Sequence, residues 1–132
     1  MTVFVDASAL VAMVVNEPEA KALSERLDAH NERLYCATGA WEATVAIARI
    51  RKVSLEEASD VLLRLLADLT IRLVPIDEVE SRMAIAAQGR YGKGSGHPAR
   101  LNMGDCFAYA CVKANGAALL YKGDDFARTD LG

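Results

Sequence analysis

The sequence predicts an α/β fold in which a central parallel sheet of four to five strands carries helices on both faces. Short apolar segments of β-favouring residues alternate with longer segments of helical periodicity, and parallel strands need such crossovers. The chain has 132 residues, of which 52% are hydrophobic, enough for one core. No internal repeat or low-complexity stretch divides it, so we expect a single domain over residues 1–132.

The first half of the chain is predicted to contain two strands and four helices. The expected order is a strand over residues 2–5, helices over 8–15 and 19–29, a strand over 33–37, and helices over 38–52 and 54–69. An Asn-Glu-Pro tripeptide separates the first two helices, because proline cannot continue a helix. The spacing of Trp41, Val45 and Ala48, with Ile47 or Ile50, predicts one apolar face on the third helix.

The second half repeats the alternation. It is predicted to form a strand over residues 71–76, helices over 77–90 and 102–116, and a strand over 117–121. The helix over 54–69 is the clearest in the chain, because Ser54 and Glu57 have the spacing of a capping box and its leucines recur with helical period. Strands and helices in this order favour a parallel sheet.

The net charge and the cysteine content indicate which ligands the protein could bind and in which cellular compartment it works. The net charge of −3 gives the chain no overall electrostatic footprint for nucleic acid, so a local basic patch or a metal ion would have to hold a polyanion. Cys36, Cys106 and Cys111 form no Cys-x-x-Cys pair and are expected to be buried thiols in a reducing cytosol. No basic leader or run of about 18 to 20 apolar residues is present, so we expect a cytoplasmic protein without a membrane segment.

Acidic residues stand where the predicted strands end. Asp6 follows the first strand, and Asp124 and Asp125 follow the last. Glu42 lies in the first turns of the helix after the second strand, and Asp105 lies near the start of the helix that precedes the last strand. Sites in open α/β sheets form at the carboxyl ends of the strands, so these side chains are expected to meet at one edge.

Each acidic residue also has a purely structural interpretation. Asp6 suits a helix N-cap, and Asp105 stands three residues after Asn102, as in a capping box. Gly-Asp-Asp is common turn chemistry, and Glu42 could be a surface residue, although its neighbours are apolar. The functional interpretation depends on the joint placement. Clustered carboxylates repel unless a cation neutralises them, and an oxygen-only set suits Mg²⁺ or Mn²⁺, which activates water and binds phosphate oxygens.

Four segments of the sequence resemble the acidic motifs of PIN-domain nucleases. They are FVDASALVAM, CATGAWEATVAIAR, LNMGDCFAYA and LLYKGDDFARTDLG, in the family's order over nearly the whole chain. The segment YGKGSGHPARLNMGDCFAYA resembles the VapC branch, the toxins of bacterial toxin–antitoxin pairs. The resemblance implies a PIN-like fold and a metal-dependent endoribonuclease whose products carry a 5′-phosphate and a 3′-hydroxyl.

The resemblance also implies a role for each acidic position. Asp6 and Asp105 match the principal metal ligands, and Glu42 matches the residue that binds metal or orients the attacking water. Ser8 matches a small hydroxyl residue that orients the first carboxylate or begins the helix.

The fourth acidic position departs from the pattern of many relatives. In this chain Gly123 takes the place of a first aspartate, and two aspartates are adjacent. We predict Asp124 as the third metal ligand, with Asp125 as a local cap or a supporting group.

Basic residues could hold the RNA. Arg49, Arg51 and Lys52 end the helix that carries Glu42, and Arg90, Lys93, His97 and Arg100 flank a glycine-rich loop beside Asp105. For Arg51 and Lys52 a solvated helix end is an equal interpretation, so Arg49, Arg90, Lys93 and Arg100 are the predicted RNA contacts. The glycine spacing before Lys93 does not match a phosphate-binding loop.

The resemblance further implies a small antitoxin as partner and a homodimer. The apolar helices over 7–15 and 54–69 could supply both interfaces or belong to the core. Two other functions compete with the nuclease. One is a phosphotransferase with Asp6 as nucleophile, although Ser8 stands where haloacid-dehalogenase-like enzymes have a second aspartate. The other is a non-catalytic binding module with a retained acidic pocket.

Overall fold

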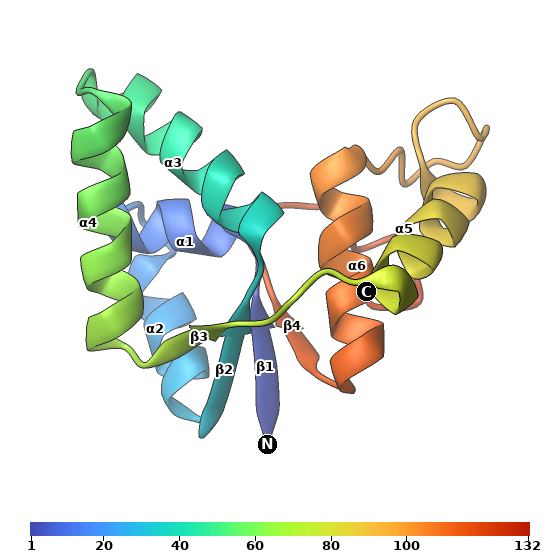
Figure 1. The fold of residues 1–132 in the computed structure, drawn as a ribbon, viewed down its shortest axis with the longest axis horizontal. Coiled ribbons are helices and arrows are strands. Elements are labelled where there is room, and N and C mark those ends of the chain that lie inside the picture. The colour runs from blue at the N-terminus through green and yellow to red at the C-terminus, as the bar shows by residue number, and fades with distance from the viewer.

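The computed structural model describes residues 1–132 and contains the four strands and six helices that the sequence predicts (Figure 1). The elements are β1 (Thr2–Val5), α1 (Ala7–Val14), α2 (Ala20–Asp28), β2 (Glu32–Tyr35), α3 (Ala37–Arg51), α4 (Leu55–Asp68), β3 (Ile71–Leu73), α5 (Glu78–Tyr91), α6 (Met103–Asn115) and β4 (Ala118–Leu120). None of the helices combines the length and the hydropathy that crossing a membrane requires.

The four strands form one parallel sheet in the order β3-β2-β1-β4. Phe4 on β1 pairs with Leu34 on β2, and Val5 pairs with Leu120 on β4. The strand predicted over residues 71–76 is shorter in the structure, because β3 ends at Leu73 and residues 74–76 lie outside the sheet. The N–H of Val74 still donates to Tyr35 O at 2.9 Å, but Pro75 has no N–H with which to continue the ladder.

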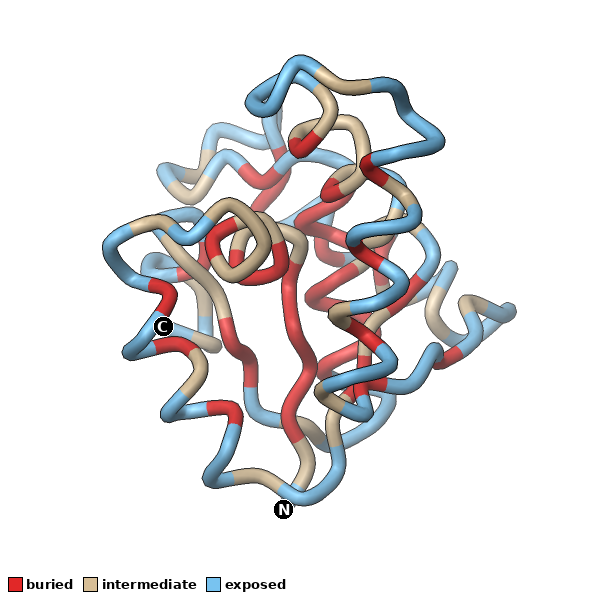
Figure 2. Tube along the Cα trace, turned by 90° about the vertical axis from the view of Figure 1, so that its left-hand side faces the viewer, coloured by how far each residue is buried: buried red, intermediate tan, exposed pale blue.

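The sheet separates two apolar cores. Successive side chains of a strand point to opposite faces, so Val3 and Val5 belong to one core and Phe4 to the other. The first core is closed by α1, α2, α3 and α4, and the second by α5, α6 and the C-terminal segment (Figure 1). Figure 2 shows the buried stretches running through the interior strands and the inner turns of the helices. The predicted helices on both faces are confirmed.

The apolar face predicted for α3 is wrong at Trp41, whereas the alternative with Ile47 is confirmed and Ala48 packs against the core. The helix buries Gly39, Ala43 and Ile47, whereas Trp41 is 66% exposed. Two of the three buried positions are small, which lets α3 pack closely against its neighbours. Apolar residues occupy most of the circumference of this helix, so periodicity alone could not select the inner face.

Candidate active site

The strand order places the topological switch point of the sheet at the carboxyl end of β1. From β1 the chain continues to β2 and β3 on one side and returns to β4 on the other, so the topological switch point lies between β1 and β4. Asp6 follows β1 directly, and its N–H donates to Leu120 O of β4 at 2.9 Å. The first predicted site residue therefore lies where α/β sheets form their sites.

Asp6 combines the capping role with a buried carboxylate. It is the N-cap of α1 and only 6% exposed. Its Oδ2 accepts the N–H of Ser8 at 3.0 Å and the hydroxyl of Ser8 at 2.6 Å, so Oδ1 faces no side-chain donor. Burial raises the pKa of Asp6, and the two bonds from Ser8 oppose that increase. One oxygen thus caps the helix while the other is left for a ligand.

Asp105 has the same double role at the start of α6. Its N–H donates to Asn102 Oδ1 at 2.8 Å, and its Oδ2 accepts the N–H of Asn102 at 3.1 Å, which completes the expected capping box. The residue is 7% exposed, and burial raises its pKa to about 6. The charges of Asp125 and Asp6 add to the increase, whereas the Asn102 N–H and Lys93 lower it.

Glu42 reaches the start of α6 from α3. Its carboxylate lies against the Cα of Gly104, so a side chain at that position would overlap it. Burial, together with the charges of Asp6 and Asp105, raises the pKa of Glu42 to about 7. Sequence reasoning overlooked Gly104. Its only signal was a glycine in the first turn of a predicted helix, where glycine lowers helix stability.

Asp124 and Asp125, the two candidates for the fourth acidic position, differ in how their charges affect the other carboxyls. The charge of Asp125 is among the main causes that raise the pKa of Asp6, Glu42 and Asp105, and the charge of Asp124 is not among them. Instead, the carbonyl oxygen of Asp124 accepts the N–H of Ala127 at 3.1 Å, as in a turn. The electrostatics therefore associate Asp125 with the other three carboxylates, and the choice of Asp124 as the third metal ligand stays a prediction.

Ser8 and Lys122 connect the two ends of the site. The Ser8 hydroxyl donates to Asp6 and accepts the N–H of Lys122 at 2.9 Å. Lys122 Nζ forms ion pairs with Glu17 at 2.6 Å and Glu19 at 3.5 Å. These contacts fix the start of the loop that carries Asp125. The tether could not be read from the sequence, because Ser8 and Lys122 are 114 positions apart.

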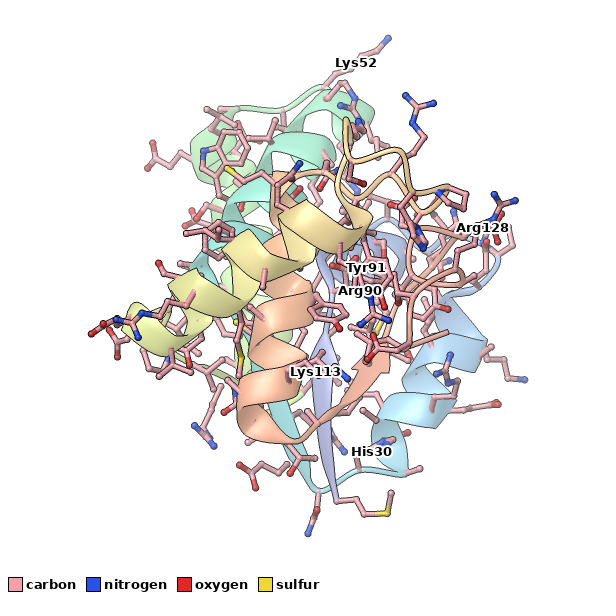
Figure 3. All side chains as sticks on the ribbon, turned by 90° about the vertical axis from the view of Figure 1, so that its right-hand side faces the viewer. His30, Lys52, Arg90, Tyr91, Lys113 and Arg128 are labelled. Atoms are coloured by element: carbon pink, nitrogen blue, oxygen red, sulfur yellow. The ribbon has the colours of Figure 1, made fainter.

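The predicted RNA-binding residues separate into two groups. Lys93 lies near enough to Asp105 to lower its pKa, and Arg49 and Arg100 are exposed. Arg90 instead lies over the ring of Tyr91, 4.7 Å from its centroid, and lines a hollow with Tyr109 and Lys113. Figure 3 shows Arg90, Tyr91 and Lys113 on the α5–α6 side and Lys52 at the far end of the molecule. The structure does not bring Arg90 to the carboxylates.

Two further basic residues have structural contacts. Arg51 Nη2 donates to Val14 O at 2.6 Å, which ties the end of α3 to α1. His97 Nδ1 accepts the N–H of Ala99 at 3.0 Å, and its ring packs edge-on against Tyr91. Both contacts stabilise the local backbone.

The donor set suits a hard divalent cation. All four groups assigned to this site are carboxylates, and burial is the main cause that raises the pKa of three of them, Asp6, Glu42 and Asp105. No three His, Cys, Asp or Glu side chains lie close enough to hold one ion directly, so the predicted set of three direct ligands is not assembled. Mg²⁺ usually keeps several waters and binds through one or two carboxylates, which this arrangement can supply.

Comparisons with known proteins place the chain in a family. The family model for the PIN domain matches residues 3–131. The chain belongs to the PIN-domain family. A VapC ribonuclease of Rhizobium meliloti (strain 1021) is 39% identical over 140 residues, which cover 98% of this chain and 99% of that protein. Ribonuclease VapC42 of Mycobacterium tuberculosis is 39% identical over 127 residues, covering 96% of this chain and 95% of that protein.

A solved structure agrees with the fold. Mycobacterium tuberculosis VapC20, a toxin that cleaves the sarcin–ricin loop, superposes with a TM-score of 0.72. The match covers 95% of this chain and 92% of VapC20 at 16% sequence identity. The predicted PIN-like sheet and the resemblance to the VapC branch are confirmed.

Proposed function

We propose that this chain is a VapC-type endoribonuclease that hydrolyses RNA phosphodiester bonds with Mg²⁺, or Mn²⁺, as cofactor. The observation that carries the proposal is that Asp6, Glu42, Asp105 and Asp125, from four separate segments, are close enough for their charges to raise the pKa of neighbouring carboxyls. The relatives named VapC ribonucleases, which share 39% identity over almost the whole chain, support the choice of RNA as substrate.

Each of the acidic residues has its own proposed role in the reaction. Asp6 and Asp105 would hold the cation, with Asp125 as the fourth carboxylate and Asp124 as the alternative that the sequence favoured. A divalent cation held by these residues would supply Lewis-acid chemistry: it would bind a scissile phosphate and lower the pKa of a water molecule. Glu42, with a pKa of about 7, can accept a proton from that water near neutral pH. The water oxygen bonds to phosphorus, the P–O3′ bond breaks, and the leaving oxygen takes a proton to become a 3′-hydroxyl.

Contacts to the RNA backbone come from the basic residues above this edge. Lys93 lies beside Asp105, and Arg49 and Arg100 are exposed on α3 and on the loop after α5. Such groups position a phosphate without reading the sequence. A small antitoxin protein and a second copy of the chain complete the proposed set of partners.

The test is cleavage of mixed total RNA by the purified protein, freed of any partner, with Mg²⁺, with Mn²⁺ and with chelator. We expect metal-dependent cleavage that Asp6→Asn abolishes. Asp125→Asn and Asp124→Asn form a matched pair, of which the first should lose activity and the second should retain it. Circular dichroism checks that each variant is folded. Failure of the folded, metal-loaded protein to cleave any RNA would favour the binding-module interpretation.

A further inference from the structure

A shallow apolar hollow adjoins Glu42. It is lined by Thr38, Trp41 and Glu42 of α3 and by Met103, the first residue of α6. Trp41 is 66% exposed and Met103 is 64% exposed, although both side chains are among the most apolar in the protein. Neither residue contributes to the two cores, so the fold does not account for a tryptophan at this position.

The lining of the hollow indicates what kind of group it accepts. No cationic side chain lines it, and Glu42 repels anions, so a phosphate group is disfavoured there. A neutral planar group fits the indole face and the flexible thioether of Met103. Unpaired RNA bases are recognised in this way, by stacking on aromatic side chains.

The position of the hollow relates it to the reaction. Glu42 belongs both to the hollow and to the carboxylate cluster, so a group bound beside Trp41 lies next to the reacting phosphate. We propose that Trp41 is a stacking platform for one unpaired base next to the scissile phosphate, with Met103 as the opposite wall. This inference rests on the proposed ribonuclease function and adds a base-binding subsite to it.

The chain offers a direct probe, because Trp41 is its only tryptophan. A random-sequence RNA octamer is titrated into the folded Asp6→Asn variant, with intrinsic fluorescence and fluorescence anisotropy of a labelled octamer recorded together. We expect binding by anisotropy to be accompanied by quenching of Trp41. The same octamer with abasic nucleotides should bind without the quenching.

Variants test the contribution to cleavage. In the otherwise unaltered protein, Trp41→Ala should lower kcat/KM on the order of 10- to 100-fold, the usual value of one base–aromatic stack. Trp41→Phe should keep most of the activity, and Trp41→Leu, which is apolar but cannot stack, should resemble Trp41→Ala. Leu63→Ala is the matched control, because Leu63 is 54% exposed on α4, a helix that carries none of the proposed site residues.

The outcomes are distinguishable. RNA that binds without quenching Trp41, or a Trp41→Ala protein that cleaves like the parent, overturns the stacking subsite and leaves the ribonuclease standing. A loss of dimer in Trp41→Ala by light scattering, with no quenching by RNA, assigns the hollow to a second copy and also overturns it. If the parent protein neither cleaves nor binds RNA, the proposed function fails, and the subsite fails with it.

Discussion

Gly104→Ala tests whether the contact between α3 and α6 positions Glu42. The new methyl group would occupy the space of the Glu42 carboxylate, and an ordinary contact of about 3.5 to 4 Å requires that carboxylate to move by more than about 1 Å. A misplacement of this size in a catalytic group costs on the order of 100-fold in rate. Folding should be little affected, because the displaced atoms are the end of a flexible side chain and alanine favours the helix by up to about 1 kcal/mol.

The assay compares kcat/KM for RNA cleavage with the free energy of unfolding in denaturant. Gly89→Ala is the matched control: it lies on α5, nothing is within 4 Å of the position its methyl group would take, and it should keep full activity. We expect Gly104→Ala to lose activity while its stability stays within about 1 kcal/mol of the parent. Activity within a few-fold of the parent, or a parallel collapse of stability, would refute the argument that Gly104 makes room for Glu42.

Three further predictions concern the same site. Ser8→Ala leaves the Lys122 N–H without its acceptor and removes a bond that lowers the pKa of Asp6, so unfolding free energy should fall by about 1–3 kcal/mol, with weaker metal dependence of cleavage. Lys122→Met should reduce cleavage more than it reduces thermal stability, and Lys122→Arg should restore cleavage, because the ion pairs to Glu17 and Glu19 hold the Asp125 loop; equal activity of both variants would contradict this. In chelator, the free energy of unfolding should decline as pH rises from about 4 to about 7, because folded Glu42 and Asp105, with pKa values of about 7 and about 6, keep protons that the unfolded chain releases. Mg²⁺ should reverse this decline, and Glu42→Gln should reduce it. A melting temperature independent of pH would show that these carboxyls titrate normally.

The sequence determined the order of the elements and named the carboxylates of the proposed site. The alternation of strands and helices, the Asn102 capping box and the acidic residues after β1 and before β4 follow from local patterns, which depend on neighbouring residues alone. The placement of Asp6 and Asp105 at one sheet edge followed from the rule for parallel sheets. Local patterns could not decide which face of α3 is buried, because that depends on what packs against the helix.

Tertiary structure decided the remaining features of the site. The effect of the Asp125 charge on the other carboxyls, the contact of Glu42 with Gly104 and the tether from Lys122 each depend on segments distant in the chain. Adjacent residues in a turn point in different directions, so the sequence names both aspartates but cannot choose between them. The exposed position of Trp41 has the same cause: the small residues Gly39 and Ala43 pack inward, and the tryptophan is left beside the proposed site.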